Sequence, residues 1–253
     1  MIIYFSATGN CKYTAEALAQ KTDDKTKSIL DFMESREKAD FTDEKRLGII
    51  SPTYSWGLPS IVRDFVQNTE IAVSENTYVY FVSTYGTTPG ASVHEMRRLL
   101  REKDIEIDSV YSIRMPDTWT PIFNLSDNRK VEAINAAAKS EIAAAAGSIL
   151  AGERTGHMKR QMPSFTLAIA GRIYDSMRRT DNLYVENSCI GCGLCERNCP
   201  VNAIEIKDGR PAWIKQQCAM CLGCLHRCPV FAIQYGRGKT KAHGQYINPY
   251  TEL

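Results

Sequence analysis

Apolar runs with strand character alternate with segments of helical periodicity over the first 150 residues of the chain. Four runs are predicted strands: Met1–Phe5, Arg46–Ile50, Tyr78–Ser83 and Ile105–Ile113. Three segments are predicted helices: Cys11–Gln20, Ala91–Arg101 and Asp127–Leu150. Strands that alternate with helices in this way predict an α/β domain whose parallel sheet is covered on both faces.

A turn-rich break follows the long predicted helix, and residues 151–180 form a predicted connector. Within it, Pro163–Thr180 carries an apolar stripe at helical spacing, made of Phe165, Ile169, Ile173 and Met177. We expect a bridging helix that buries this stripe and docks one domain on the other. The alternative is a basic face that binds a partner, formed by Arg172, Arg178 and Arg179.

Eight of the nine cysteines lie in a motif that occurs twice, 189-CIGCGLCERNCP-200 and 218-CAMCLGCLHRCP-229. Each copy has the spacing C-x2-C-x2-C-x3-C-P. Thiolates two residues apart on a tight loop can converge on one side of the backbone and hold three corners of a cubic iron–sulfur cluster. The fourth cysteine of each copy lies past a turn and points away, so each half-site is incomplete alone.

In this spacing the fourth cysteine ligates the other cluster. One predicted ligand set is Cys189, Cys192, Cys195 and Cys228, and the other is Cys218, Cys221, Cys224 and Cys199. Zinc is the alternative, although zinc sites usually leave a longer gap between their two cysteine pairs. Residues 181–235 resemble the bacterial ferredoxins that carry two [4Fe–4S] clusters, which implies a small α+β domain.

Composition and charge narrow the class of protein. A net charge of +2 argues against a dedicated nucleic-acid binder. No run reaches the roughly 20 apolar residues that a membrane span requires, and the N-terminus lacks the basic region of a signal peptide. Nine cysteines in a reducing compartment indicate metal or redox chemistry rather than disulfides. We therefore expect a cytoplasmic protein without a membrane span or a nucleic-acid partner.

A phosphate-binding loop is predicted where the first strand meets the first helix. Backbone amides and the hydroxyls of Ser6 and Thr8 can donate hydrogen bonds there, and the helix N-terminus adds positive potential. Neither the Walker lysine motif nor the G-x-G-x-x-G dinucleotide motif is present. The stretch Ser6–Asn10 resembles the flavodoxin family, in which such a loop binds the phosphate of FMN.

The resemblance departs from the family at Cys11, where flavodoxins usually have Thr or Ser. A thiol at a helix N-terminus can have a lowered pKa. The interpretation that we favour is that the Cys11 side chain fills space and that its backbone N–H does the binding.

Two further loops are expected to contact the flavin. A doubly wound sheet of strand order 2-1-3-4-5 places its ligand loops after strands 1, 3 and 4. Tyr54 or Trp56 is predicted to cover one face of the flavin ring and Tyr85 the other. The complete predicted FMN-binding set is Ser6, Ala7, Thr8, Gly9, Asn10, Cys11, Pro52, Thr53, Tyr54, Ser55, Trp56, Gly57, Ser83, Thr84, Tyr85 and Gly86.

The whole chain resembles the flavodoxin–ferredoxin hybrid proteins of anaerobes, on FSATGN, PTYSWGLP, the double cysteine motif and the QYINP tail. The resemblance implies a flavodoxin-like domain over residues 1–150, the connector, a two-cluster ferredoxin domain over 181–235, and a tail over 236–253 that packs on the domains. It also implies FMN and two [4Fe–4S] clusters that exchange electrons within one chain.

The function indicated by these cofactors is an electron carrier that serves redox partner proteins. The alternative is an FMN-dependent reductase of a small molecule, fed by its own ferredoxin domain. Tyr54, Tyr85, His94 and Cys11 are candidate proton donors for such an enzyme, but none lies in a motif that supports the role. A flavin-free scaffold or redox sensor is a third class, and it would require loss of phosphate binding.

Overall fold

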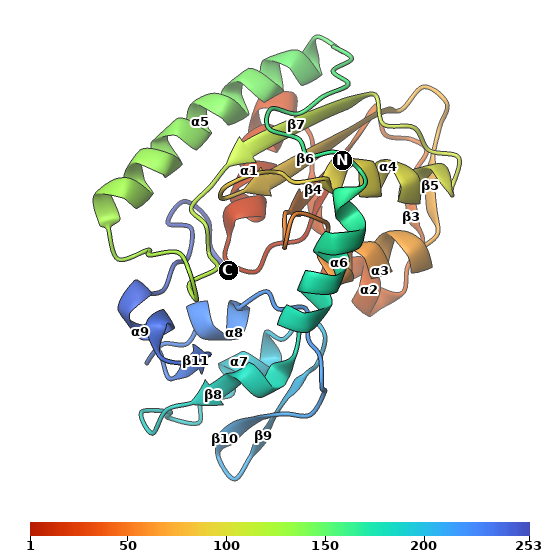
Figure 1. Ribbon diagram of the computed structural model, residues 1–253. Coiled ribbons are helices and arrows are strands. Elements are labelled where there is room, and N and C mark those ends of the chain that lie inside the picture. Colours follow the sequence, from red (N-terminus) through yellow and green to blue (C-terminus); the bar gives the residue numbers. More distant parts are fainter.

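The central element of the computed structural model, which describes residues 1–253, is a five-stranded parallel sheet (Figure 1). Its strands are β1 (Ile2–Tyr4), β2 (Thr26–Ser28), β4 (Arg46–Pro52), β6 (Tyr78–Tyr85) and β7 (Ser109–Arg114). They lie in the order β2-β1-β4-β6-β7. Counted along the chain within this sheet, the order is 2-1-3-4-5, which confirms the predicted flavodoxin-like fold class.

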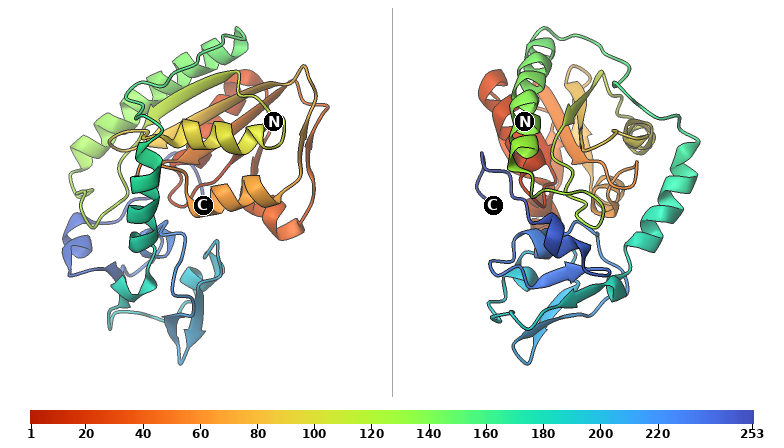
Figure 2. Two further views of the ribbon diagram at one scale, coloured as in Figure 1. Left: turned by 45° about the vertical axis from the view of Figure 1, so that its right-hand side comes forward. Right: turned by 60° about the vertical axis from the view of Figure 1, so that its left-hand side comes forward.

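Helices cover both faces of this sheet (Figures 1 and 2). On one face lie α1 (Asn10–Thr22) and α5 (Asn128–Leu150). On the other lie α2 (Ile29–Ser35), α3 (Ser60–Asn68) and α4 (Ser92–Arg101). Asp127 caps the long helix, since its side chain accepts a hydrogen bond from the amide of Lys130. A separate two-stranded parallel sheet, β3 (Ala39–Phe41) and β5 (Ile71–Val73), lies beyond the main one.

The last strand of the main sheet is shorter than the alternation over Ile105–Ile113 predicted. Ile105 and Ile107 are buried and Glu106 is exposed, as in a strand. Their backbone nevertheless forms no ladder, and pairing with β6 begins only at Ser109. Alternate side chains of this loop are buried, so its sequence has the apolar–polar alternation of a strand although its backbone joins no strand ladder.

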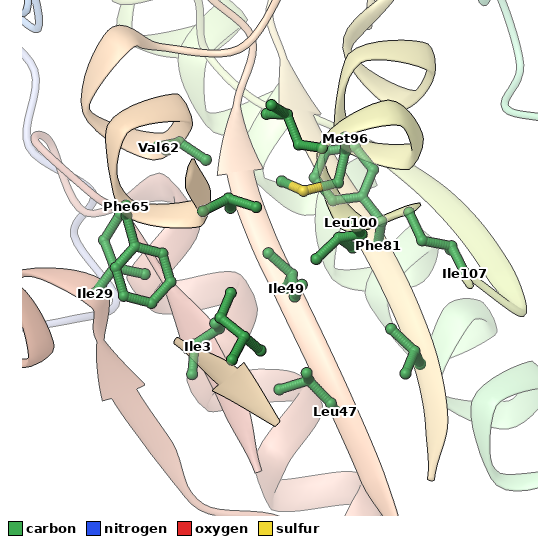
Figure 3. Packing of buried hydrophobic residues seen from close by; sticks show 14 of the residues in the cluster. Ile3, Ile29, Leu47, Ile49, Val62, Phe65, Phe81, Met96, Leu100 and Ile107 are labelled. Atoms are coloured by element: carbon green, nitrogen blue, oxygen red, sulfur yellow. The ribbon is translucent and has the colours of Figure 1, made fainter. Parts of the chain in front are cut away.

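Two apolar cores hold the layers together. The larger core lies between the sheet and α2, α3 and α4, where Ile49 and Phe81 from the central strands pack against Phe65 and Met96 (Figure 3). The smaller core lies under α1 and α5 and contains Leu18, Tyr80 and Ile142. Because the two central strands are buried on both faces, they are almost continuously apolar, as expected for parallel strands.

The cysteine motifs lie in a second region below the carboxyl edge of the sheet (Figure 1). Each motif contains a one-turn helix before its last cysteine, α7 (Leu194–Arg197) or α8 (Gly223–His226). Two antiparallel pairs complete the region, β8 (Leu183–Val185) with β11 (Ile233–Tyr235), and β9 (Ile204–Lys207) with β10 (Arg210–Trp213). A 3-10 turn at Thr180–Asn182 precedes it, and α9 (Lys239–His243) follows it.

The connector contains helix α6 (Thr166–Met177), which runs along the outside of the molecule toward the cysteine region (Figure 2). The predicted buried stripe is wrong for most of its length, because Phe165, Ile169 and Ile173 are 74%, 60% and 38% exposed. The helix instead buries Ala170 and Tyr174. The Tyr174 hydroxyl donates to the carbonyl of Ala219 at 2.6 Å and accepts from the amide of Ser60 at 3.3 Å, so one phenol joins the two regions.

The structure contains no helix that combines the length and the apolar character needed to cross a membrane.

Tyr80 and Gly48 provide a test of the packing inside the sheet. The Tyr80 hydroxyl is buried without a hydrogen-bond partner, so we expect Tyr80→Phe to leave the free energy of unfolding unchanged or to raise it by up to about 1–3 kcal/mol. A Cβ at Gly48 would lie 2.4 Å from the Tyr80 ring. Gly48→Ala should therefore lower the free energy of unfolding by roughly 1–3 kcal/mol. Denaturant unfolding of the two variants measures both effects, and a destabilised Tyr80→Phe would contradict the first.

Candidate functional site

The principal cleft lies at the carboxyl edge of the main sheet and has a volume of about 340 Å³. This volume is within the range of small-molecule sites. Thirteen of the sixteen residues predicted to bind FMN line it: Ser6, Ala7, Thr8, Asn10, Cys11, Pro52, Thr53, Tyr54, Ser55, Trp56, Thr84, Tyr85 and Gly86. The structure thus brings together the three loops that follow β1, β4 and β6.

Three residues of the predicted set lie outside the cleft. Gly9 packs against the tail, because a Cβ there would lie 2.8 Å from that of Asn248. Gly57 closes the turn by exchanging backbone hydrogen bonds with Tyr54, and its open side faces Glu95. Ser83 is fully buried below the cleft, 2.7 Å from the hydroxyl of Thr53. These residues shape the loops rather than line the cavity.

Several lining residues were not expected from the sequence. They come from the rest of the loop after β6, from the loop after β7, from α6 and from the second cysteine motif: Thr87, Thr88, Met115, Pro116, Asp117, Thr118, Trp119, Ile122, Phe123, Ile173, Tyr174, Met177, Met220, Cys221 and Leu222. The loop after β7 was foreseeable, since it ends a strand at the same edge as the other three loops. No local pattern indicates that a cysteine loop closes the same cleft.

The loop before α1 has the free donors that an anion requires. The backbone N–H groups of Thr8, Asn10 and Cys11 donate no hydrogen bond within the chain, and the Thr8 hydroxyl also has no hydrogen-bond partner. The Ser6 hydroxyl accepts from the amide of Gly9 at 3.1 Å, and Gly9 has a positive φ of 93° that turns the chain into the helix. A helix N-terminus with free amides fits a phosphate, and the residues present therefore fit the phosphate end of FMN.

The side chains of Asn10 and Cys11 do not contribute donors to that cradle. Asn10 donates from its side chain to the carbonyl of Pro116, and its Oδ1 faces Tyr246 and Asn248. Cys11 is buried, and its sulfur lies 3.1 Å from the hydroxyl of Thr84. Burial raises the pKa of the Cys11 thiol to about 12, so the lowering that a helix N-terminus can produce is absent. This supports the space-filling role for the thiol.

Aromatic side chains border the cleft as predicted for a flavin ring. Tyr54 and Trp56 come from the turn after β4, and Tyr85 comes from the end of β6. Trp56 is 39% exposed at the mouth, whereas burial raises the pKa of the Tyr54 phenol well above its usual value. The ring of Tyr54 lies 6.2 Å from that of Tyr174 on α6.

Asp117 is the single carboxylic acid among the residues that line the cleft. Its Oδ1 accepts from the amide of Trp119 at 3.1 Å. Its Oδ2 has no hydrogen-bond partner and lies against Gly86, where a Cβ would approach it to 2.2 Å. Burial raises the pKa of this carboxyl above its ordinary value of 3.8. No lysine, arginine or histidine lines the cleft, so Asp117 has no counter-charge there.

The eight motif cysteines surround two separate small cavities. Cys189, Cys192, Cys195 and Cys228 line one, and Cys199, Cys218, Cys221 and Cys224 line the other. Each cavity therefore holds three cysteines from one motif and the last cysteine from its twin, which are the two predicted ligand sets. All-thiolate donor sets lined by apolar side chains fit iron–sulfur clusters.

The spacing between donor atoms distinguishes a cluster site from a site for a single metal ion. No three His, Cys, Asp or Glu side chains lie close enough together to share one metal ion. A cubane has an iron at each of four corners and holds its thiolates further apart than one zinc ion does, so the cysteine cavities suit a cluster better.

The cleft and the second cysteine cavity share a wall. Met220, Cys221 and Leu222 line both. Behind them, a Cβ at Gly223 would meet the Ala7 side chain at 3.7 Å, so this cysteine loop lies on the loop before α1. The first cysteine cavity lies away from the cleft, and there Cys192 is exposed and Ile190 is 63% exposed.

Solved structures of flavoproteins show distant similarity that covers about half of the chain. A putative flavoprotein from Bacteroides uniformis is 16% identical over 46% of this chain and 90% of its own, with a TM-score of 0.36. A flavoprotein from Lactobacillus acidophilus in complex with FMN is 17% identical over 52% and 96%, with a TM-score of 0.32. A flavodoxin from the domain Archaea is 15% identical over 56% and 96%, with a TM-score of 0.33.

Family models identify both parts of the chain. No curated protein matched it in a search of such sequences. A model of the flavodoxin domain matches residues 1–143, and a model of the 4Fe-4S binding domain matches residues 183–205, which include the first cysteine motif. The chain therefore belongs to the flavodoxin domain family and, with its 4Fe-4S binding domain, is a flavodoxin–ferredoxin hybrid protein.

Proposed function

We propose that this protein is an electron carrier that relays electrons between FMN in the cleft and two [4Fe–4S] clusters in the cysteine cavities. The observation that carries the proposal is the shared wall Met220–Leu222, which separates the cleft from a four-cysteine cavity by one stretch of backbone and its side chains. Two redox centres separated by so thin a wall can exchange electrons directly. A flavin accepts one or two electrons and a cluster passes one, so the pair suits a relay between carriers of both kinds.

The proposed cofactor sites follow from the two groups of lining residues. FMN would be held by the loops after β1, β4 and β6, with its phosphate at the amides of Thr8, Asn10 and Cys11. One cluster would be ligated by Cys218, Cys221, Cys224 and Cys199, and the second by Cys189, Cys192, Cys195 and Cys228. We call these the proximal and the distal cluster.

The sequence of transfer would be FMN, proximal cluster, distal cluster and an external protein. Exposure of Cys192 and Ile190 supports the distal end as the contact point for a redox partner. On the proximal side, Cys221 and Leu222 face the cleft and exclude water between the two centres. The direction of flow follows the potential of the partner.

Backbone amides around the sulfurs would tune both clusters. Met220 donates to the Cys218 sulfur at 3.2 Å and Ala203 to the Cys199 sulfur at 3.2 Å, both in the proximal set. Ala232 donates to the Cys228 sulfur at 3.3 Å in the distal set. Such bonds stabilise negative charge on sulfur and raise the reduction potential.

A reductase of small molecules is the second candidate function, and Asp117 is the observation that favours it. Of the proton donors considered from the sequence, His94 lies outside the cleft and is bonded to Gln161. Burial raises the pKa of Cys11 to about 12 and also raises those of Tyr54 and Tyr85. Asp117 is the one carboxylic acid in the cleft, and burial raises its pKa, which suits a group that exchanges a proton with a substrate.

Cofactor analysis of anaerobically purified protein tests the proposal most directly. We expect one FMN, about eight iron atoms and equivalent sulfide per chain, since two cubanes hold eight irons. The visible spectra of flavin and clusters should change together in a redox titration. Zinc without flavin would reject the proposal, and saturable turnover of a small molecule in stopped-flow reduction would favour the reductase.

Cysteine variants test the proposed order of the clusters. Cys192→Ala should remove the distal cluster, leave about four irons, and preserve electron exchange between FMN and the remaining cluster. Reduction of this variant by a small reduced ferredoxin should slow. Cys221→Ala should abolish exchange with FMN while the distal cluster still accepts electrons. Iron content, EPR spectra and stopped-flow absorbance measure these effects, and equal flavin exchange in both variants would contradict the order.

Asp117 predicts a pH dependence of the flavin potential. Its pKa is raised, so the carboxyl is neutral below that pKa and negative above it. Negative charge disfavours electrons on the flavin, so the midpoint potential should fall more steeply with pH across this titration. Asp117→Asn should remove the additional slope and give a less negative potential at high pH. Spectroelectrochemical titration over a pH series provides the measurement. Superimposable curves for the parent and Asp117→Asn would contradict the predicted pH dependence.

A further inference from the structure

The tail after α9 forms a buried polar connection between the two cofactor sites. We refer to residues Gly244–Thr251 as the strap. It passes from the cysteine region back to the edge of the sheet, where the chain ends (Figure 1). Tyr246 is 7% exposed and Asn248 is 1% exposed, so this segment is part of the interior rather than a loose end.

At one end the strap holds the loop before α1. The Asn248 amide donates to the carbonyl of Thr8 at 2.8 Å, and its side-chain Nδ2 donates to Oδ1 of Asn10 at 3.1 Å. The Tyr246 hydroxyl also lies 3.1 Å from that oxygen and from Oδ1 of Asn135. These contacts fix the residues whose amides form the proposed phosphate cradle.

At the other end the strap holds the second cysteine motif, which carries three proposed ligands of the proximal cluster and Cys228 of the distal one. The side chain of Gln245 donates to the carbonyls of Leu225 and Cys228 at 2.7 and 2.8 Å, where α8 ends. The Tyr246 amide donates to Nδ1 of His226 at 3.1 Å. Because Nδ1 accepts, the other ring nitrogen carries the proton and donates to the carbonyl of Thr118 at 2.8 Å.

We propose that the strap positions the two cofactor sites against each other and couples their occupancy. Asn248 and Tyr246 are the positioning residues, and they act through Asn10 on the flavin side and through His226 on the cluster side. The inference rests on the proposed function, since it concerns FMN and the proximal cluster.

Coupling of this kind is reciprocal. A filled proximal cavity orders α8 and the strap, and the strap then orders the loop that binds the phosphate. By thermodynamic linkage, FMN must stabilise the cluster by the same factor by which the cluster tightens FMN. A buried hydrogen bond whose partner is removed leaves a polar group unsatisfied, so single changes in the strap should weaken the link measurably.

The test compares Tyr246→Phe and Asn248→Ala with the parent full-length protein, all purified anaerobically. Tyr250→Phe is the matched control, because Tyr250 lies in the same strap, is 44% exposed, and its hydroxyl makes no hydrogen bond in the chain. FMN dissociation constants are measured with clusters in place and after oxidative removal of the clusters. Stopped-flow absorbance measures electron exchange between flavin and clusters at full cofactor occupancy.

We expect each test variant to bind FMN roughly tenfold more weakly, as loss of one buried hydrogen bond implies. Exchange between flavin and clusters should slow, whereas iron content should match that of Tyr250→Phe. Removal of the clusters should weaken FMN binding in the parent, and this effect should shrink in Asn248→Ala.

Two outcomes would overturn the inference. Unchanged FMN affinity and exchange rate in both test variants would reject the strap while leaving the relay intact. Loss of iron in parallel with flavin would show general destabilisation instead of positioning. A parent protein in which flavin and clusters never exchange electrons would reject the proposed function itself.

Discussion

The shared wall Met220–Leu222 is the constraint on which the rest of the arrangement depends. It requires the second cysteine loop to lie directly on the loop before α1, and small residues make this approach possible, since Gly223 faces Ala7. Tyr174, His226 and the strap all act on the same junction from different sides. These directional hydrogen bonds to backbone groups fix distance and orientation more narrowly than apolar contact does, and they lie beside the apolar packing of Tyr174, Met220 and Leu222.

The parallel sheet provides the other half of the arrangement. Its strands end at one edge, so every loop that follows a strand projects toward the same cleft. The apolar cores on both faces keep this edge rigid. A rigid platform matters for electron exchange, because the transfer depends on separation between centres that do not themselves bind each other. The cysteine region needs little core of its own when it is bonded to such a platform.

Local patterns predicted much of this structure. The long helix and the two cysteine sets follow from periodicity and spacing, which are properties of short segments. The strand order 2-1-3-4-5 was expected from the resemblance to flavodoxins, and the short edge strand β2 was not predicted. The contribution of α6 was predicted on the wrong face, because hydrophobic spacing indicates a stripe without indicating what covers it; Ala170 and Tyr174 make the contacts instead. The closure of the cleft by Cys221 and the role of Asn10 depend on tertiary contacts more than 100 residues apart along the chain, which no local pattern encodes.

The exposed rim of the first cysteine cavity has a consequence for the survival of the protein in air. Small oxidants reach a cubane through its accessible edge, and Cys192 and Ile190 provide that edge. The second cysteine cavity is separated from the cleft by the shared wall with its buried Leu222, and Trp213 also lines it. If both cavities hold clusters as proposed, oxidative damage would begin at the outer centre and spare the inner one. A briefly aerated molecule would then lose its proposed connection to partners before its internal redox pair.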